Sequence, residues 1–123
     1  MSGPPGPPVA RAARGAAAEA LAADWLRAHG CIIVERNYRC RLGEIDLIAR
    51  LGDTLLFVEV RLRTRRDYGG AAASISTAKR RRMQLAARHY LASQAREPNC
   101  RFDAILLDAL DPARIEWLTG IEV

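Results

Sequence analysis

Lysine, histidine, cysteine and aromatic residues are rare in this sequence. The rarity of several of them argues against particular classes of protein. The three cysteines, Cys31, Cys40 and Cys100, form no CxxC pair, which argues against a disulfide framework or a structural zinc site. The two histidines, His29 and His89, have no serine, cysteine or carboxylate at a spacing that would indicate a catalytic site. No stretch approaches the roughly 18 apolar residues of a membrane span, and no signal-peptide core is present. We therefore expect a cytoplasmic protein with free thiols and no membrane association.

The positive charge of the chain is carried almost wholly by arginine. Eighteen arginines accompany the single lysine, Lys79, and the formal net charge is +5. The planar guanidinium suits phosphate oxygens, so a polyanion is the first partner to consider. Genomic base composition could produce the same Arg-rich and Ala-rich chain, so the positions of the arginines matter more than their number.

The 123 residues allow one hydrophobic core and therefore one domain. Residues 1–14 are rich in proline and glycine and then in arginine and alanine. We expect this segment to be a disordered tail, with a basic arm or a transit peptide as the alternatives. Residues 15–123 are expected to form the folded domain.

The spacing of apolar residues predicts a helix, three strands, a second helix and one or two further strands. The helices are expected over residues 15–29, ended by Gly30, and from a cap at Ser74 or Ser76 to residue 91. The strands are expected over residues 31–34, 44–50, 55–63, 101–108 and 115–118, the last as a short edge strand. Residues 37–42 are expected to be a basic connection, and residues 64–73 a mobile loop. The predicted fold class is α/β.

The second and third strands are predicted to form a hairpin that sets two acidic residues opposite each other. Residues 52 and 53, Gly-Asp, suit a tight turn. With this turn Asp46 faces Glu59, and Glu44 faces Arg61. Alternation along each strand then places these four side chains on one side of the sheet. The other side is predicted to hold Ile45, Leu47, Val58, Val60 and Leu62.

Two carboxylates directly across a strand pair repel each other by about 4 kcal/mol at an effective dielectric near 20. Protonation, a neighbouring arginine or a divalent cation such as Mg²⁺ can offset this repulsion. Such an ion would favour phosphodiester hydrolysis, because it activates a bound water and neutralises charge on the phosphate. The basic residues expected to hold a nucleic-acid backbone are Arg39, Arg41, Arg63, Arg65, Arg66 and the run of Lys79, Arg80, Arg81 and Arg82.

A structural explanation of the same residues stays open. Carboxylates that alternate with arginines on one strand face also occur on solvated, salt-bridged surfaces, where such pairs contribute little to stability. Glu19 can be read as an ordinary glutamate at the border of the buried face of the first helix. Residues 80–82 can be read as a solvated helix face.

The segments Gly43 to Ala49 (GEIDLIA) and Phe57 to Arg61 (FVEVR) resemble the YraN-like family, uncharacterised bacterial proteins of the restriction-endonuclease-like, PD-(D/E)XK superfamily. The similarity spans roughly residues 15–118 and includes the first helix, Arg36-Asn37-Tyr38, Lys79 and Arg101-Phe102-Asp103. The combined pattern is specific, whereas GEID or ExR alone would be weak.

This resemblance implies the αβββαβ nuclease core, a mixed sheet flanked by helices, and a relationship to archaeal Holliday-junction resolvases. It also implies that Glu19, Asp46 and Glu59 are the metal-binding carboxylates, for Mg²⁺ or Mn²⁺. The lysine of the superfamily motif falls on Arg61, which stays protonated and cannot act as a base. Arg61 is then expected to stabilise the transition state, and Lys79 is a candidate replacement for the missing lysine.

The function predicted from the sequence is a metal-dependent, endonuclease-like protein that acts on nucleic acid, with branched or damaged DNA favoured. Two other functions stay open. One is a nucleic-acid-binding module with weak or no catalysis, and the other is a basic subunit that binds an acidic protein. A homodimer through the last strand or the loop at residues 64–73 is also left open.

Overall fold

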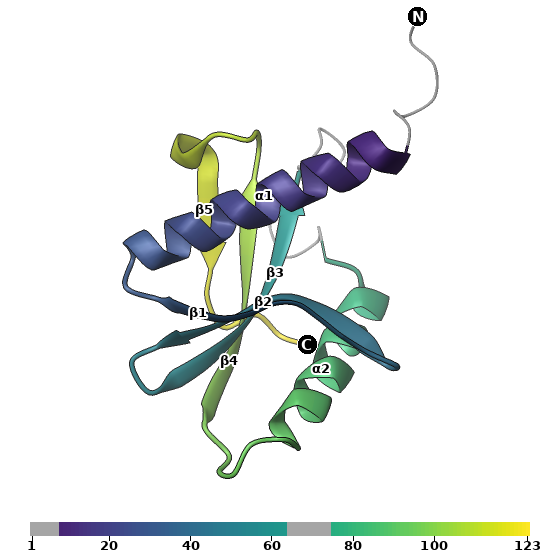
Figure 1. Cartoon of the computed structure of the whole chain (residues 1–123), viewed down its shortest axis with the longest axis vertical. Helices are drawn as coiled ribbons and strands as arrows, with labels where there is room; N and C mark the ends of the chain where they lie inside the picture. Colours follow the sequence, from purple (N-terminus) through teal and green to yellow (C-terminus); the bar gives the residue numbers. More distant parts are fainter. Residues whose placement is uncertain (1–7, 64–74) are drawn as a thin grey trace, which may run out of the picture.

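A computed structural model describes residues 8–63 and 75–123, with side chains from residue 15 onward. Its elements are α1 (Pro8–Ala28), β1 (Ile32–Cys40), β2 (Gly43–Leu51), β3 (Thr54–Leu62), α2 (Thr77–Leu91), β4 (Asn99–Leu107), the short 3-10 helix η3 (Pro112–Arg114) and β5 (Ile115–Leu118). The strands form one sheet in the order β1-β2-β3-β4-β5, in which only β3 and β4 are parallel neighbours (Figure 1). The predicted α/β class and αβββαβ order are confirmed.

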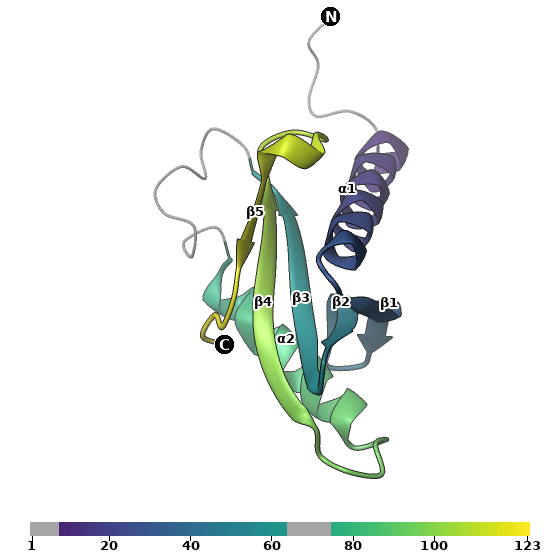
Figure 2. The same ribbon diagram turned by 90° about the vertical axis from the view of Figure 1, so that its left-hand side faces the viewer.

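The two long helices cover opposite faces of the sheet, as Figures 1 and 2 show together. Alternation along β3 sends Leu56 and Val58 into a core with Leu26 of α1. The neighbouring Phe57 points to the other face and packs in a core with Tyr90 of α2. Both faces of β3 are therefore buried, as expected for a central strand with a parallel neighbour.

Helix α1 begins at Pro8, so the predicted disordered tail is wrong for residues 8–14. Alanine and arginine are strong helix formers, and proline is well tolerated in the first turn of a helix. Residues 1–7 lie outside the described residues. The helix ends as predicted at Gly30, whose φ of 92° suits glycine. The backbone N–H groups of Gly30 and Cys31 donate to Arg27 and Leu26, as in a Schellman motif.

Strand β1 is longer than predicted and includes most of the supposed basic connection. The strand continues to Cys40, which pairs with Gly43, so that only Arg41 and Leu42 form the turn. Tyr38 and Cys40 pack into the core under α2, while Arg39 between them is exposed. Apolar residues at alternate positions thus make a strand of a segment that is basic overall.

Helix α2 begins after Ser76, whose hydroxyl accepts a hydrogen bond from the Lys79 backbone N–H at 3.1 Å. The predicted apolar stripe is buried, with Met83, Ala86, Ala87 and Tyr90 against the sheet. The alternative cap Ser74 and the predicted loop at residues 64–73 lie outside the described residues. In the part of the chain that the structure describes, neither long helix is apolar enough to cross a membrane.

Candidate functional site

The hairpin of β2 and β3 has the predicted turn, and its strands separate at Asp46. Gly52 has a φ of 62°, and the pairing runs from Leu51 with Thr54 to Leu47 with Val58. Beyond Leu47 the strands no longer pair directly. Instead, the Asp46 Oδ2 atom accepts a hydrogen bond from the Val60 backbone N–H at 2.8 Å. The Asp46 side chain therefore replaces a backbone acceptor at the point where the two strands part.

The break changes which side chains share a face. Ile45 was predicted to lie with Leu47, but it packs with Ile48 and Phe57 under α2, whereas Leu47 packs under α1. This prediction is wrong because it assumed strict alternation through Asp46. The predicted opposition of Glu44 and Arg61 is wrong for the same reason, since the paired region ends before it reaches them.

Asp46 and Glu59 nevertheless meet at the break, as the register predicts. The Glu59 side chain lies on the second strand and is only 6% exposed. Burial, a hydrogen bond with Asp46 and the negative charge of Asp46 raise the pKa of Glu59 to about 9. Without a bound cation, Glu59 therefore holds a proton at neutral pH.

Glu19 of α1 belongs to the same neighbourhood. Its pKa is raised by burial and, to a smaller extent, by the negative charge of Asp46. The Oε1 atom of Glu19 is buried and has no hydrogen-bond partner within the described residues. A buried carboxylate oxygen without a donor is costly unless a proton or a cation neutralises it.

Lys79 approaches these acids from the first turn of α2. Its Nζ atom lies 3.1 Å from Glu44 Oε1 and 3.6 Å from Glu59 Oε1, and its side chain is 17% exposed. Burial opposes the charge, but the acidic side chains of Glu59 and Glu44 raise the pKa of Lys79 overall. The shorter ion pair of the lysine is with Glu44. Sequence reasoning found Lys79 but missed its bridge to Glu44.

The donor atoms are of the type that hard divalent cations prefer, but they do not form a ready-made cage. Within residues 8–63 and 75–123, no three histidine, cysteine, aspartate or glutamate side chains already stand close enough to hold a metal ion. Asp46 and Glu59 converge, and Glu19 offers a buried oxygen beside them. These residues fit a cation if it displaces the proton of Glu59 and draws the side chains together.

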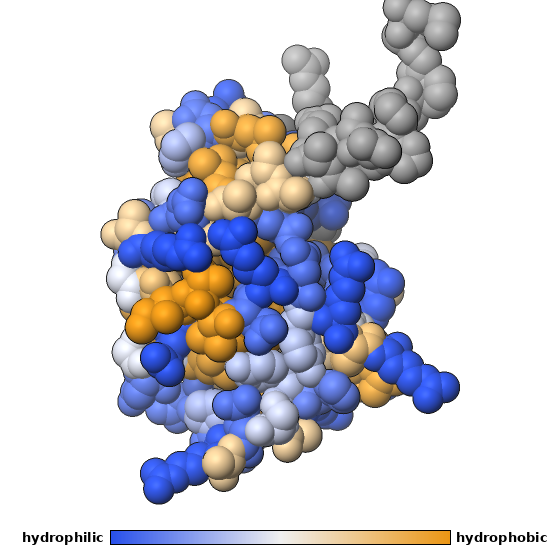
Figure 3. Space-filling view, viewed as in Figure 1, coloured by the Kyte–Doolittle hydropathy of each residue, from blue (hydrophilic) through white to orange (hydrophobic). Residues whose placement is uncertain are grey.

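The predicted basic residues other than Lys79 and Arg63 fall into three groups. Arg39, Arg41, Arg81 and Arg82 are exposed on the β1–β2 hairpin and on α2. Arg80 is partly buried and donates to the Ile75 carbonyl. Arg65 and Arg66 lie outside the described residues. The face in Figure 3 is largely hydrophilic around an apolar patch. Ile32 and Val34 of β1 are exposed apolar side chains.

Arg63 does not belong to the exposed basic residues, which corrects its predicted role in nucleic-acid binding. Its guanidinium contacts Asp108 at 2.8 Å and Glu116 at 3.2 Å, and the side chain is 13% exposed. These contacts join the end of β3 to β4 and β5. The positive charge of Arg63 is therefore already neutralised by two carboxylates.

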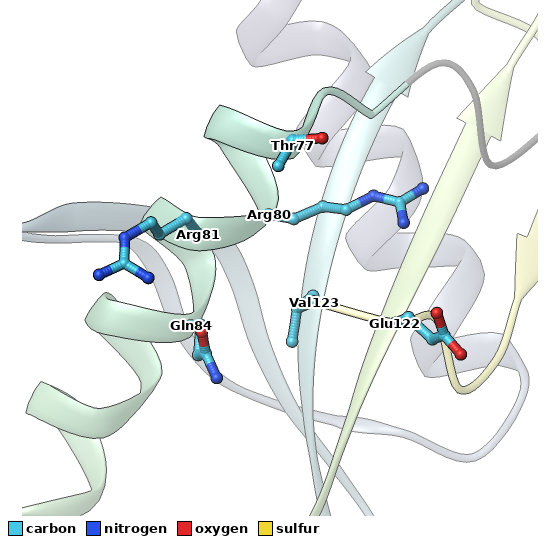
Figure 4. Close-up of a pocket in the computed structure, with 6 residues that line it drawn as sticks. All are labelled: Thr77, Arg80, Arg81, Gln84, Glu122 and Val123. Atoms are coloured by element: carbon cyan, nitrogen blue, oxygen red, sulfur yellow. The ribbon is translucent and has the colours of Figure 1, made fainter.

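A separate open cavity of about 330 Å³ lies between α2 and the last residues of the chain, lined by Thr77, Arg80, Arg81, Gln84, Glu122 and Val123 (Figure 4). Figure 4 shows Arg80 extending toward the strands and Arg81 turning away from them. None of the converging carboxylates lines this cavity, so it is not part of the acidic site.

Asp103 is a buried charged residue that sequence reasoning missed. It is fully buried on β4 and accepts hydrogen bonds from Arg101, the Trp117 indole and the Gly120 backbone N–H. An aspartate directly before the apolar run from Ala104 to Leu107 was the available signal. These bonds give it a structural role, because they tie β5 and the following turn to β4.

Comparison with known proteins identifies the family. Residues 18–107 match the model of the uncharacterised protein family UPF0102. The chain belongs to this family. A UPF0102 protein of Nitrosospira multiformis is 53% identical over 105 residues, which cover 85% of this chain and 88% of the relative. A UPF0102 protein of Cupriavidus taiwanensis is 61% identical over 109 residues, or 88% and 81% of the two chains.

The UPF0102 match confirms the resemblance to YraN-like proteins. It includes Glu19, Asp46, Glu59, Arg61 and Lys79, and it ends with β4. The acidic site therefore lies entirely within the family domain. UPF0102 is a family without an assigned activity, so the chemistry of this site has to be argued from its own residues.

Proposed function

We propose that this protein is a metal-dependent, endonuclease-like phosphodiesterase that acts on DNA. The observation that supports it is the convergence of the Asp46 and Glu59 carboxyl groups beside Glu19, at the point where β2 and β3 separate. Two acids that share a proton in a buried site are poised to exchange that proton for Mg²⁺ or Mn²⁺. A salt-bridged surface would instead leave such acids exposed and individually paired.

The roles of the residues follow from their chemistry. Asp46 and Glu59 would hold the metal ion, with Glu19 as a third or outer ligand. When bound, the ion lowers the pKa of a coordinated water and neutralises charge that develops on the phosphate. Arg61, two residues after Glu59 on β3, supplies a permanent positive charge to the phosphate. Lys79 supplies a second positive charge from α2, in place of the lysine that the superfamily motif carries at position 61.

Exposed arginines around the site would hold the nucleic-acid backbone. Arg39 and Arg41 lie on the β1–β2 hairpin, and Arg81 and Arg82 lie on the outer face of α2. Their guanidinium groups can bind phosphates without reading the base sequence. Arg65 and Arg66, in the segment between β3 and α2, are proposed to extend this surface.

The test is a cleavage screen over duplex, single-stranded, flap and four-way DNA and structured RNA, with and without Mg²⁺ or Mn²⁺. The wild-type protein should form products only with metal. Asp46→Asn should abolish cleavage while retaining DNA binding. Asp53→Asn, at the exposed tip of the same hairpin, is the matched control and should cleave like the wild type. Products that form without metal, or that persist in Asp46→Asn, would refute the proposal.

A second candidate function is a nucleic-acid-binding module without efficient catalysis. Two observations favour it: arginine occupies the motif position of lysine, and Lys79 already neutralises part of the acidic charge. Such a module would bind DNA with strong salt dependence and yield no metal-dependent product. A protein that binds an acidic partner instead would bind none of these nucleic acids tightly at physiological salt.

A further inference from the structure

The ion pairs of Lys79 carry an inference that rests on the proposed metal site and deepens it. Lys79 stands between two acidic side chains of different exposure. Glu59 is buried, whereas the Glu44 side chain is 41% exposed, and the lysine amine lies 0.5 Å closer to Glu44. The distance from Lys79 Nζ to Glu59 Oε1 exceeds that of a hydrogen bond, and this oxygen has no hydrogen-bond partner in the described part of the chain. Glu44 thus holds the Lys79 amine close to Glu59, while the amine makes no direct hydrogen bond to Glu59 Oε1.

Glu44 meets Lys79 where the β2–β3 pairing has ended. It lies two residues before Asp46, outside the paired part of the β2–β3 hairpin, and its Oε1 atom accepts a hydrogen bond from Lys79 Nζ at 3.1 Å. The other carboxylate oxygen, Oε2, lies 3.7 Å from Arg39 Nε. The Glu44 carboxylate is therefore held from two sides, by one lysine inside the site and one arginine at its rim.

We propose that Glu44 is a positioning residue for Lys79, and that the Glu44–Lys79 pair sets how tightly the acidic side chains bind a divalent cation. Once a cation has displaced the proton of Glu59, the Lys79 amine competes with that cation for the same buried Glu59 oxygen, since both are positive and approach it closely. Glu44 weakens that competition by drawing the amine toward itself. Loss of Glu44 releases the amine toward Glu59, whereas loss of the amine leaves the oxygen to the cation.

The test is a Mn²⁺ titration of the metal-free full-length protein, followed by the electron paramagnetic resonance signal of free Mn²⁺. Lys79→Met should bind Mn²⁺ about tenfold more tightly than the wild type, because a positive charge next to the site is lost. Glu44→Gln should bind it about tenfold more weakly. Arg88→Met on the exposed end of α2 and Glu35→Gln on exposed β1 are the matched controls for charge, and both should bind like the wild type.

Combining Glu44→Gln with Lys79→Met distinguishes a role of Glu44 in positioning Lys79 from a direct effect of its negative charge on the cation. If Glu44 acts through Lys79, Glu44→Gln should weaken Mn²⁺ binding by less than about threefold in the Lys79→Met background. Equal losses in both backgrounds would overturn the positioning role, and so would unchanged affinity in Lys79→Met. Glu44→Asp, which keeps the charge, should recover most of the wild-type affinity.

Failure of this inference can be told from failure of the proposed function. Saturable Mn²⁺ binding that is lost in Asp46→Asn but insensitive to Lys79 and Glu44 would refute the positioning role alone. Absence of saturable binding in the wild type and in Lys79→Met would refute the metal site and the inference together. Thermal melting of each variant checks that it is folded, and Lys79→Gln replaces Lys79→Met in the titration if the latter unfolds.

Discussion

At the scale of single residues, the acidic site is defined by the burial of one carboxyl group, that of Glu59. Glu59 is almost fully buried next to Asp46, and desolvation is the largest cause of its raised pKa. An exposed pair at the same spacing would stay ionised, since water and salt screen the repulsion. Burial therefore raises the affinity of Glu59 for a proton far above that of an exposed glutamate.

The raised pKa of Glu59 predicts that the metal-free protein loses stability as the pH rises. The pKa is about 9 in the folded chain and 4.5 for an unperturbed glutamate. The proton therefore contributes its full stabilisation below about pH 4.5, and this contribution is lost as the pH rises toward 9. Thermal melts in chelator between pH 5.5 and 9 should show a midpoint that falls by several degrees.

Glu59→Gln is the test of that assignment, because glutamine cannot titrate. Its melting midpoint should depend much less on pH than that of the wild type, and it should exceed the wild-type value at pH 9. Glu35→Gln, an exposed change on β1, should leave the wild-type profile intact. Parallel profiles for the wild type and Glu59→Gln would show that another group causes the pH dependence.

A second prediction at this scale concerns Asp103, which binds Arg101, Trp117 and Gly120 while fully buried. Asp103→Asn removes the charge and leaves a single acceptor oxygen for several donors. We expect the free energy of unfolding in urea to fall by about 2–3 kcal/mol. Asp53→Asn at the exposed hairpin tip should change it by less than about 0.5 kcal/mol. A similar small change for Asp103→Asn would contradict its role as an anchor of β5.

At the scale of elements, the β1–β2 hairpin and α2 are packed backbone to backbone at one point. A Cβ atom built on Gly43 would lie 2.0 Å from the Arg82 carbonyl oxygen. Only glycine permits this approach, which brings Arg41 on the hairpin and Arg82 on the helix to the same region of the surface. The close contact therefore also positions the arginines proposed to bind phosphate.

The same substitution should have opposite effects at two glycines. Gly43→Ala forces the hairpin away from α2 and should lower the free energy of unfolding by about 1–3 kcal/mol. Gly15→Ala lies in α1 with nothing within 4 Å of the new methyl group, and it should raise that free energy by up to about 1 kcal/mol. Chemical denaturation of both variants measures the contrast. Stability unchanged by Gly43→Ala would mean that the hairpin can move away without cost.

At the scale of the whole molecule, the acidic side chains of the site and the exposed arginines lie in different places. Acidic side chains gather between β2, β3 and α1, while arginines are exposed on the β1–β2 hairpin and on α2. Arg63 differs because Asp108 and Glu116 neutralise it at the other end of β3. Net charge alone would count all these arginines as equal, although only the exposed ones can release counterions from DNA.

This distribution predicts the salt dependence of the proposed DNA binding. Arg82→Gln should weaken binding and reduce the slope of log affinity against log salt concentration by about 1, because one phosphate contact is lost. Arg63→Gln should leave the slope unchanged and instead lower the melting midpoint. Fluorescence anisotropy over a salt series measures the slopes. A slope reduced by Arg63→Gln but not by Arg82→Gln would contradict the proposed binding surface.

Sequence patterns predicted most of the fold because local spacing reports burial directly. The stripe with Met83 and Tyr90, the turn at Gly52 and the last strand are all confirmed. The boundaries failed where local chemistry pointed elsewhere. The prolines near residue 8 favoured a disordered tail, although the helix begins there. The arginines near residue 39 favoured a basic connection, although they alternate with apolar residues of a strand.

The sequence by itself determined the class of the fold, the pairing of β2 with β3 and the approach of Asp46 to Glu59. These follow from a period of two along each strand and from one turn, which are properties of neighbouring residues. Only the tertiary structure decided that the strands part at Asp46, that Lys79 bridges Glu44 and Glu59, and that Arg63 is neutralised. Each of these depends on contacts between elements distant in the chain, whose approach is set by the packing of both helices on one sheet.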